Sequence, residues 1–198
     1  QDGDTIKGII INSGDIVVAT YLFYQDFTKE YSSDLTRRDL SDKESKLLTA
    51  RNEILNNLNK YKYPVTCPDG FSLNMILIPY NDGYKFYIIT GTSQNGVIPF
   101  GNDYIFFAGS DYAIKDWRKF HSGLIPVESN SGENAIISSV HSHLKKEPFI
   151  SATDICTFKL YASYVGLNSF SVYSPALSLY FRYSLASDSI ETSRKMFD

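Results

Sequence analysis

The sequence has few cysteines and no long apolar run. Its two cysteines, Cys67 and Cys156, form no CxxC or zinc-knuckle spacing, and two cysteines cannot indicate a redox compartment. Cys156 falls on the apolar face of an expected helix, which favours a buried, inert thiol, while a Cys67–Cys156 disulfide stays open. No apolar stretch approaches the roughly 20 residues that span a bilayer, so we expect no membrane span.

The chain also lacks a concentration of positive charge. It carries 22 acidic residues against 19 Lys and Arg, and the basic residues are scattered along the sequence. This pattern argues against a dedicated nucleic-acid binder or a binder of anionic membranes. The first residues, Gln1-Asp2-Gly3-Asp4, are polar and lack a start methionine. We therefore expect that the chain was shortened at its N-terminus, either by a signal peptidase or by deliberate design. The first origin implies a secreted, periplasmic or cell-surface protein, and a cytoplasmic location stays open.

Aromatic residues are abundant instead, with 15 tyrosines and 13 phenylalanines in 198 residues. This composition favours strands and aromatic packing over a helical bundle, so we expect a mixed α/β (α+β) fold. The length fits one domain over residues 1–198, with N-terminal strands and a polar surface excursion in residues 1–40.

Local patterns predict the order of the elements. Ser41-Asp42-Lys43-Glu44 is a capping-box pattern before an apolar stripe at helical spacing, which predicts a helix from about Asp42 to Tyr61. Residues 111–120, including Trp117 as a core anchor, predict a short helix, and Ser151 caps a third helix that ends near Val165. Strands are predicted at Thr5–Asn12, Asp15–Tyr24, Leu73–Tyr80, Tyr84–Thr90, Asp103–Ala108, Ala135–His143, Asn168–Ser174 and Leu177–Tyr183.

The most informative motif is His141-Ser142-His143, followed after ten residues by Asp154, with Ser151 three positions before that aspartate. On a strand, residues i and i+2 point to the same face, so the two imidazoles can converge on one ion. Two nitrogens and one carboxylate oxygen form the ligand set of a catalytic zinc with an open position for water. Ser151 and Asp154 alone would also suit a helix cap without a metal, but the histidine pair favours metal binding.

This motif resembles that of the JAMM (JAB/MPN) metallopeptidases, and all four positions match. The resemblance implies a JAB/MPN (cytidine-deaminase-like) core, a mixed sheet with packed helices, with the metal motif in residues 135–175 and extra N-terminal elements. It also implies Zn²⁺ on His141, His143 and Asp154, a protein or peptide substrate, and zinc-dependent metallopeptidase or isopeptidase activity. Ser151 would donate a hydrogen bond to the oxyanion or the water. JAMM-like domains also occur as toxin modules in bacterial secreted proteins.

The sequence departs from the family at the general base. The family places a glutamate on an earlier strand, where this chain has Asn74, and an amide cannot accept the proton. Glu133 and Glu128 precede the metal strand and are candidate substitutes, although each also suits a solvated loop. The remaining early glutamates are better explained by surface, capping or helix-face positions: Glu30, Glu44 and Glu53. The second hypothesis is therefore a degenerate JAMM-fold module that binds a protein or peptide, keeping or losing the metal, without hydrolysis.

The third histidine, His121, lies near no other candidate ligand in the sequence. A surface or capping role is therefore favoured over metal ligation for His121. Leu144 follows the second histidine, where the family usually has proline, and this difference affects loop rigidity more than ligation.

Overall fold

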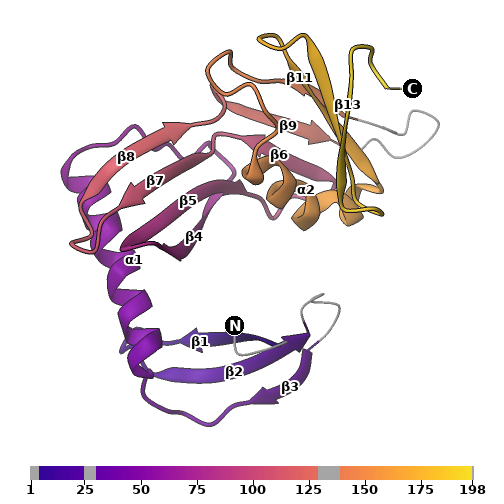
Figure 1. The fold of residues 1–198 in the computed structure, drawn as a ribbon. Helices are drawn as coiled ribbons and strands as arrows, with labels where there is room; N and C mark the ends of the chain where they lie inside the picture. The colour runs from indigo at the N-terminus through magenta and orange to yellow at the C-terminus, as the bar shows by residue number, and fades with distance from the viewer. Residues whose placement is uncertain (1–4, 25–29, 129–138, 198) are drawn as a thin grey trace. The chain divides into compact units, whose positions relative to one another are not determined.

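The computed structural model describes residues 5–24, 30–128 and 139–197 (Figure 1). These residues form two helices and several sheets, which confirms a mixed α and β protein. The chain divides into two compact units, residues 1–52 and residues 53–198. Two expectations stay predictions: that residues 1–198 form a single domain, and that this domain has a JAB/MPN core.

The first unit contains an antiparallel sheet in the order β1-β2-β3. The expected hairpin is confirmed, because β1 (Thr5–Ile11) pairs with β2 (Val17–Tyr24). The expected surface excursion instead contributes β3 (Glu30–Asp34), which pairs antiparallel with β2. A strand that pairs with the edge of a sheet gains backbone hydrogen bonds without any apolar periodicity of its own. The sequence pattern therefore gave no signal for β3.

Helix α1 (Asp42–Lys60) begins at the predicted capping box. The Ser41 amide donates to Glu44 Oε2 at 2.9 Å, and the Glu44 amide donates to Ser41 Oγ at 3.4 Å. Arg38 and Lys7 also bind the Glu44 carboxylate, at 2.7 and 2.8 Å. Hydrogen bonding from Arg38 outweighs burial and holds the pKa of Glu44 well below its usual range. Glu44 is therefore committed to the start of α1.

The second unit contains a sheet in the order β4-β5-β7-β8. The hairpin of β4 (Ser72–Tyr80) and β5 (Gly83–Gly91) is confirmed, as is β7 (Tyr104–Ala108). The short helix expected at residues 111–120 is wrong, because β8 (Ile114–Lys119) forms there and pairs with β7. Trp117 pairs across the strands with Phe106, with ring centroids 6.0 Å apart, and such aromatic pairs stabilise a sheet.

Two further strands form a separate pair that the sequence analysis missed. They are β6 (Val97–Gly101) and β9 (Leu124–Glu128), which run antiparallel. Pro99 and Pro126 lie opposite each other in this pair. Because proline lacks the amide donor, it argues against a strand when only local sequence is considered.

The C-terminal part is a βαβ unit extended by two strands. Strand β10 (Val140–Ser142) runs parallel to β11 (Ser169–Ser174), and α2 (Ala152–Val165) connects them. Strands β12 (Leu179–Ser184) and β13 (Ser189–Ser193) complete the order β10-β11-β12-β13. The predicted helix and final hairpin are confirmed, while residues 135–138 of the expected metal strand lie outside the described residues.

An aromatic core fixes α2 in place against β6 and β11. Phe158 of α2 is fully buried, with its ring centroid 4.9 Å from Phe170 and 6.4 Å from Phe100. Ala162 and Tyr183 are buried in the same cluster. Fully burying side chains of this size contributes about 1.5–3 kcal/mol each. The core therefore holds the N-terminus of α2 close to the end of β10.

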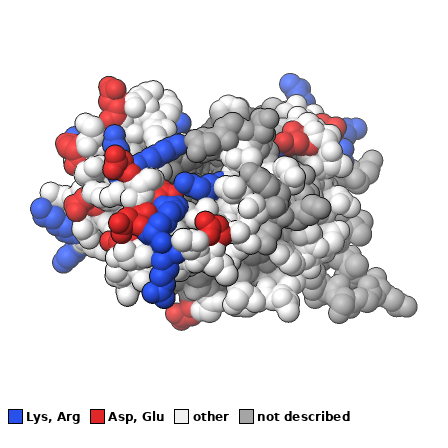
Figure 2. All heavy atoms as spheres, turned by 90° about the horizontal axis from the view of Figure 1, so that it is seen from below, with Lys and Arg blue, Asp and Glu red and all other residues white. Residues whose placement is uncertain are grey.

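The surface agrees with the scattered charge of the sequence. In the face drawn in Figure 2, Lys and Arg side chains are interspersed with Asp and Glu rather than gathered in one patch. Among the described residues, no helix has the length and apolar character needed to cross a membrane.

Candidate metal centre

The end of β10 buries two histidines on one side of the strand. His141 is 7 % exposed and His143 is 4 % exposed, whereas Ser142 between them is exposed. The His141 ring packs between Phe100 and Phe170, with centroids 5.1 and 6.1 Å away. His143 places its Nδ1 2.6 Å from the carbonyl oxygen of Phe149. A carbonyl only accepts, so this nitrogen carries the proton and Nε2 of a neutral His143 presents its lone pair.

The start of α2 supplies a carboxylate through a complete capping box. The Asp154 amide donates to Ser151 Oγ at 3.0 Å, and the Ser151 amide donates to Asp154 Oδ2 at 2.8 Å. The Ser151 hydroxyl also donates to Oδ2 at 2.6 Å. Asp154 Oδ1 is buried and has no hydrogen-bond partner. The capping role and a ligand role therefore coexist on this aspartate.

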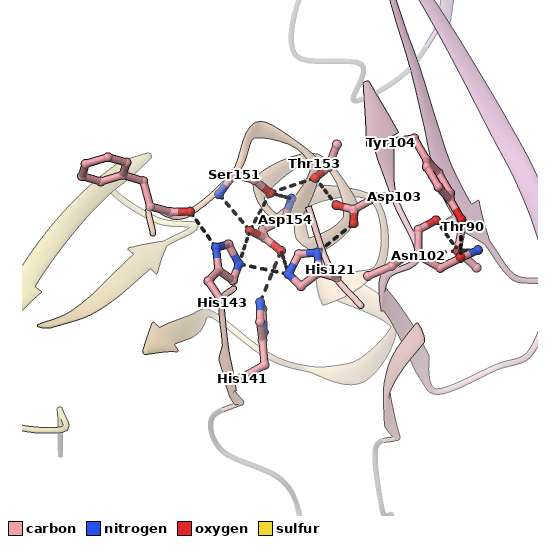
Figure 3. A network of polar contacts seen from close by, with 12 residues as sticks. Thr90, Asn102, Asp103, Tyr104, His121, His141, His143, Ser151, Thr153 and Asp154 are labelled. Atoms are coloured by element: carbon pink, nitrogen blue, oxygen red, sulfur yellow. Dashed lines mark hydrogen bonds and ion pairs between the residues drawn. The ribbon is translucent and has the colours of Figure 1, made fainter. Parts of the chain in front are cut away.

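The side chains of His141, His143 and Asp154 converge, as the sequence spacing predicts, and His121 joins them (Figure 3). Asp154 Oδ1 lies 3.3 Å from Nε2 of both His121 and His141, and Oδ2 lies 3.1 Å from His143 Nε2. The Nε2 atoms of His121 and His143 are 3.0 Å apart. All four residues are buried, and their donor atoms lie within 4.8 Å of one another. The cluster could hold a metal ion.

The expectation that His121 has a surface or capping role is wrong. Its side chain is 1 % exposed, and its Nδ1 lies 2.7 Å from Asp103 Oδ1. His121 follows β8 in the segment before β9, so its position depends on the pairings of both strands. Local spacing could not detect this contact. The only available signal was that His121 is the remaining histidine in a chain with three.

A tight connection between β6 and β7 presents Asp103 to His121. Gly101 and Asn102 both have positive φ angles, of 76° and 50°. The Asn102 amide donates to the Gly123 carbonyl at 2.9 Å, and the Phe120 amide donates to the Asp103 carbonyl at 3.2 Å. These bonds hold the segment that carries His121 against the turn that carries Asp103.

The Asn102 side chain anchors the same turn from behind (Figure 3). Its Nδ2 donates to the Thr66 carbonyl at 2.8 Å, and its Oδ1 accepts from the Tyr104 hydroxyl at 3.0 Å. Nδ2 also lies 3.4 Å from Thr90 Oγ1. Buried polar networks that are satisfied in this way rigidify their surroundings, so the Asp103 backbone is well supported.

The electrostatics of the cluster suit a cation. Burial would raise the pKa of Asp154, but the close approach of His141 and His143 outweighs it and places the pKa far below its usual range. Burial lowers the pKa of His141. Burial would also lower the pKa of His121, but Asp103 and then Asp154 raise it overall.

Three buried atoms in the cluster have no hydrogen-bond partner: Nδ1 and Nε2 of His141, and Oδ1 of Asp154. Buried polar atoms are normally paired, and leaving one unpaired costs free energy. A metal ion in the cluster would satisfy His141 Nε2 and Asp154 Oδ1 together, so the residues fit such an ion.

The other residues considered from the sequence either lie outside the cluster or fall outside the described part of the chain. Asn74 of β4 lines a cavity of about 330 Å³ together with Tyr161. Tyr161 is seven residues after Asp154 on α2, which corresponds to about 10 Å along the helix axis. Glu128 is exposed at the end of β9. Glu133 and the side chain of Glu30 lie outside the described residues. Glu44 is in the α1 cap, and Glu53 is exposed on α1.

Both cysteines are free, so the disulfide that the sequence left open is absent. Cys67 is exposed, and Cys156 is half-buried rather than buried. Burial still raises the pKa of the Cys156 thiol, which keeps it protonated and unreactive at neutral pH.

Comparisons with family models, curated proteins and solved structures find no match to this chain. Functional inference therefore depends on the geometry of the cluster.

Proposed function

We propose that this chain is a zinc-dependent hydrolase of the JAMM type that acts on a peptide or isopeptide bond. The observation that carries the proposal is the convergence of His141, His143 and Asp154 from the strand end and the helix start of one βαβ unit. This is the ligand set that the His-x-His, ten residues, Asp spacing implies. Two imidazoles and a carboxylate leave a position on zinc for water.

Donor type and donor spacing support zinc over a harder cation. Mg²⁺ and Ca²⁺ prefer oxygen ligands, whereas imidazole nitrogens suit zinc and other transition metals. Zinc bonds of about 2.0–2.1 Å in a tetrahedron give ligand-to-ligand edges of about 3.3 Å. His121 Nε2 lies 3.0 Å from His143 Nε2 and 3.3 Å from Asp154 Oδ1, and His141 Nε2 lies 3.3 Å from the same oxygen. These three separations match the edges of a zinc tetrahedron, and the four donor atoms together lie within 4.8 Å of one another.

In the proposed enzyme, His141, His143 and Asp154 would hold the metal, which supplies an acidified water and polarises the substrate carbonyl. The Ser151 hydroxyl at the N-cap of α2, bonded to Asp154 Oδ2, orients this carboxylate, and it would also donate to a developing oxyanion. The proposed base is Glu133, with Glu128 as its substitute.

A second candidate function is that of a degenerate module with the same fold, which binds a protein or peptide without hydrolysing it. Two observations favour it. Asn74, which the order of elements aligns with the family's glutamate, offers only an amide and lines the cavity beside Tyr161, and His121 lies where a fourth ligand would stand.

Metal analysis and a single-turnover peptidase assay test the proposal. The untagged protein, purified with zinc, should contain about one zinc per chain, and His143→Ala should remove it. Hydrolysis that is lost in Glu133→Gln but kept in Glu53→Gln, a matched exposed glutamate, would support the enzyme. Metal binding without turnover, with activity gained only in Asn74→Glu, would support the binding module. Absence of bound zinc would overturn the hydrolase.

A further inference from the structure

We propose that His121 is a fourth protein ligand of the metal and that Asp103, anchored by Thr153, is its positioning residue. The resting centre is then closed by three imidazoles and one carboxylate, and water reaches the metal only when His121 leaves or a fifth ligand is added. This inference deepens the proposed function, because it depends on zinc binding but not on hydrolysis.

The first argument is the direction of the His121 lone pair. Asp103 Oδ1 accepts from His121 Nδ1 at 2.7 Å, which keeps the proton on Nδ1. His121 Nε2 then presents a lone pair toward Asp154 and His143. A carboxylate that fixes the outer nitrogen of a ligating histidine is the usual support of zinc-bound imidazoles.

The second argument is the contact between two imidazoles. His143 Nδ1 also carries its proton, because its partner is the carbonyl oxygen of Phe149. In their neutral forms, His121 and His143 therefore face each other with two lone pairs, whose nitrogens are 3.0 Å apart. Such a contact requires a proton or a cation between the two rings. A metal ion satisfies both lone pairs and the unpartnered Asp154 Oδ1 at once.

The third argument is that Asp103, which supports His121, is itself hydrogen-bonded to α2. Thr153 Oγ1 donates to Asp103 Oδ2, and the Thr153 and Ser151 hydroxyls are 2.8 Å apart. Figure 3 shows this chain of contacts running from His121 through Asp103 and Thr153 to the first turn of α2, which also carries Asp154. Asp103 and Thr153 are 2 and 3 % exposed. The network therefore fixes His121 relative to Asp154.

Cobalt substitution distinguishes a ligand from a structural neighbour. The wild-type protein loaded with Co²⁺ should show the visible absorption of a four-coordinate centre, and zinc competition should give its affinity. His121→Gly should shift the cobalt spectrum, and added imidazole should restore it. Asp103→Asn should weaken zinc binding by about 10–100-fold, as for other outer partners of zinc ligands. Gly123→Ala, at a position with open space beside it, is the matched control in the same segment.

The outcomes separate this inference from the proposed function. Absence of zinc and cobalt binding in the wild type overturns both. Metal binding with a spectrum and an affinity that neither His121→Gly nor Asp103→Asn changes overturns the fourth ligand alone. If His121→Gly does not fold, Asp103→Asn decides, because it keeps the size of the side chain while removing its charge and one of its two acceptor oxygens.

Discussion

At the scale of single residues, Asp154 divides its two oxygens between two tasks. Oδ2 accepts the cap bonds from Ser151, while Oδ1 lies 3.3 Å from two imidazoles without a hydrogen-bond partner. We predict that Asp154→Asn keeps α2 intact, because an amide oxygen can still accept from the Ser151 amide. Zinc affinity should fall at least tenfold, because the amide carries no charge. Circular dichroism and zinc competition measure the two effects separately, and equal zinc affinity in the variant would contradict the ligand role.

Protonation of the same cluster predicts how pH acts on the protein with and without zinc. In the metal-free protein, His141 has a lowered pKa, so acidification below about 6.5 destabilises the fold through it. His121 has a raised pKa, so its contribution is present below about 6.5 and is lost as pH rises. The His141 effect therefore acts below about pH 6.5 and the His121 effect above it, while Asp154 loses its stabilising effect only below about pH 4.

Zinc changes this balance because its imidazole ligands must be neutral. We predict that the rise in melting temperature on adding zinc is large near about pH 7.5 and small near about pH 5.5. Thermal unfolding with zinc or with a chelator at both pH values measures this difference. A zinc effect that is independent of pH would argue against histidine ligands.

The sequence predicted three of the four residues of the cluster. His141, His143 and Asp154 lie within one βαβ unit, so local spacing and a capping pattern were enough to group them. His121 and Asp103 depend on strand pairings between β6 and β9 and between β7 and β8, and no local pattern encodes such contacts. A general base on a distant strand is beyond local spacing in the same way, and Asn74 was aligned with the family's glutamate by the order of elements alone.

At the scale of elements, the connection between β6 and β7 determines where His121 lies. A Cβ atom on Gly101 would lie 2.3 Å from the Gly123 carbonyl oxygen, and φ is already 76° there. We predict that Gly101→Ala displaces the His121 segment and lowers zinc affinity as well as stability. Gly123→Ala has no neighbour within 4 Å and should change neither. Zinc competition and chemical denaturation of both variants test the prediction, and equal behaviour of the two would contradict it.

The two helices, which begin with capping signals, and the strands with apolar runs were predictable, whereas β3, β6, β8, β9 and β13 were not. Ser41 and Ser151 mark the starts of α1 and α2 because each forms a capping box with an acidic residue three positions later. Residues 114–119 were assigned to a helix, but cross-strand packing of Trp117 on Phe106 decides in favour of β8. Strand preference depends on such tertiary neighbours more than helix preference does.

At the scale of the whole chain, the metal cluster belongs to one compact unit. All four donors lie within residues 53–198, and none lies within residues 1–52 among the residues that the structure describes. We predict that zinc removal lowers hydrogen-exchange protection in β10, β11 and α2 and leaves β1 and β2 unchanged. A ligand at about 100 times its dissociation constant adds about 2.7 kcal/mol of stability. Exchange measured with and without a chelator tests this, and an equal loss of protection in β1 and β2 would contradict it.

The surroundings of His141 bear on how quickly a metal would exchange. His121 and His143 are each held through Nδ1, by Asp103 and by the Phe149 carbonyl, whereas His141 Nδ1 has no partner. Ring packing, rather than a hydrogen bond, orients His141, which contacts Phe100, Phe170, His121 and His143. Its bond to a metal can therefore open by ring rotation without breaking a hydrogen bond. Metal dissociation should therefore begin at His141. Phe170→Leu should increase the rate of metal release by a larger factor than it lowers the equilibrium affinity.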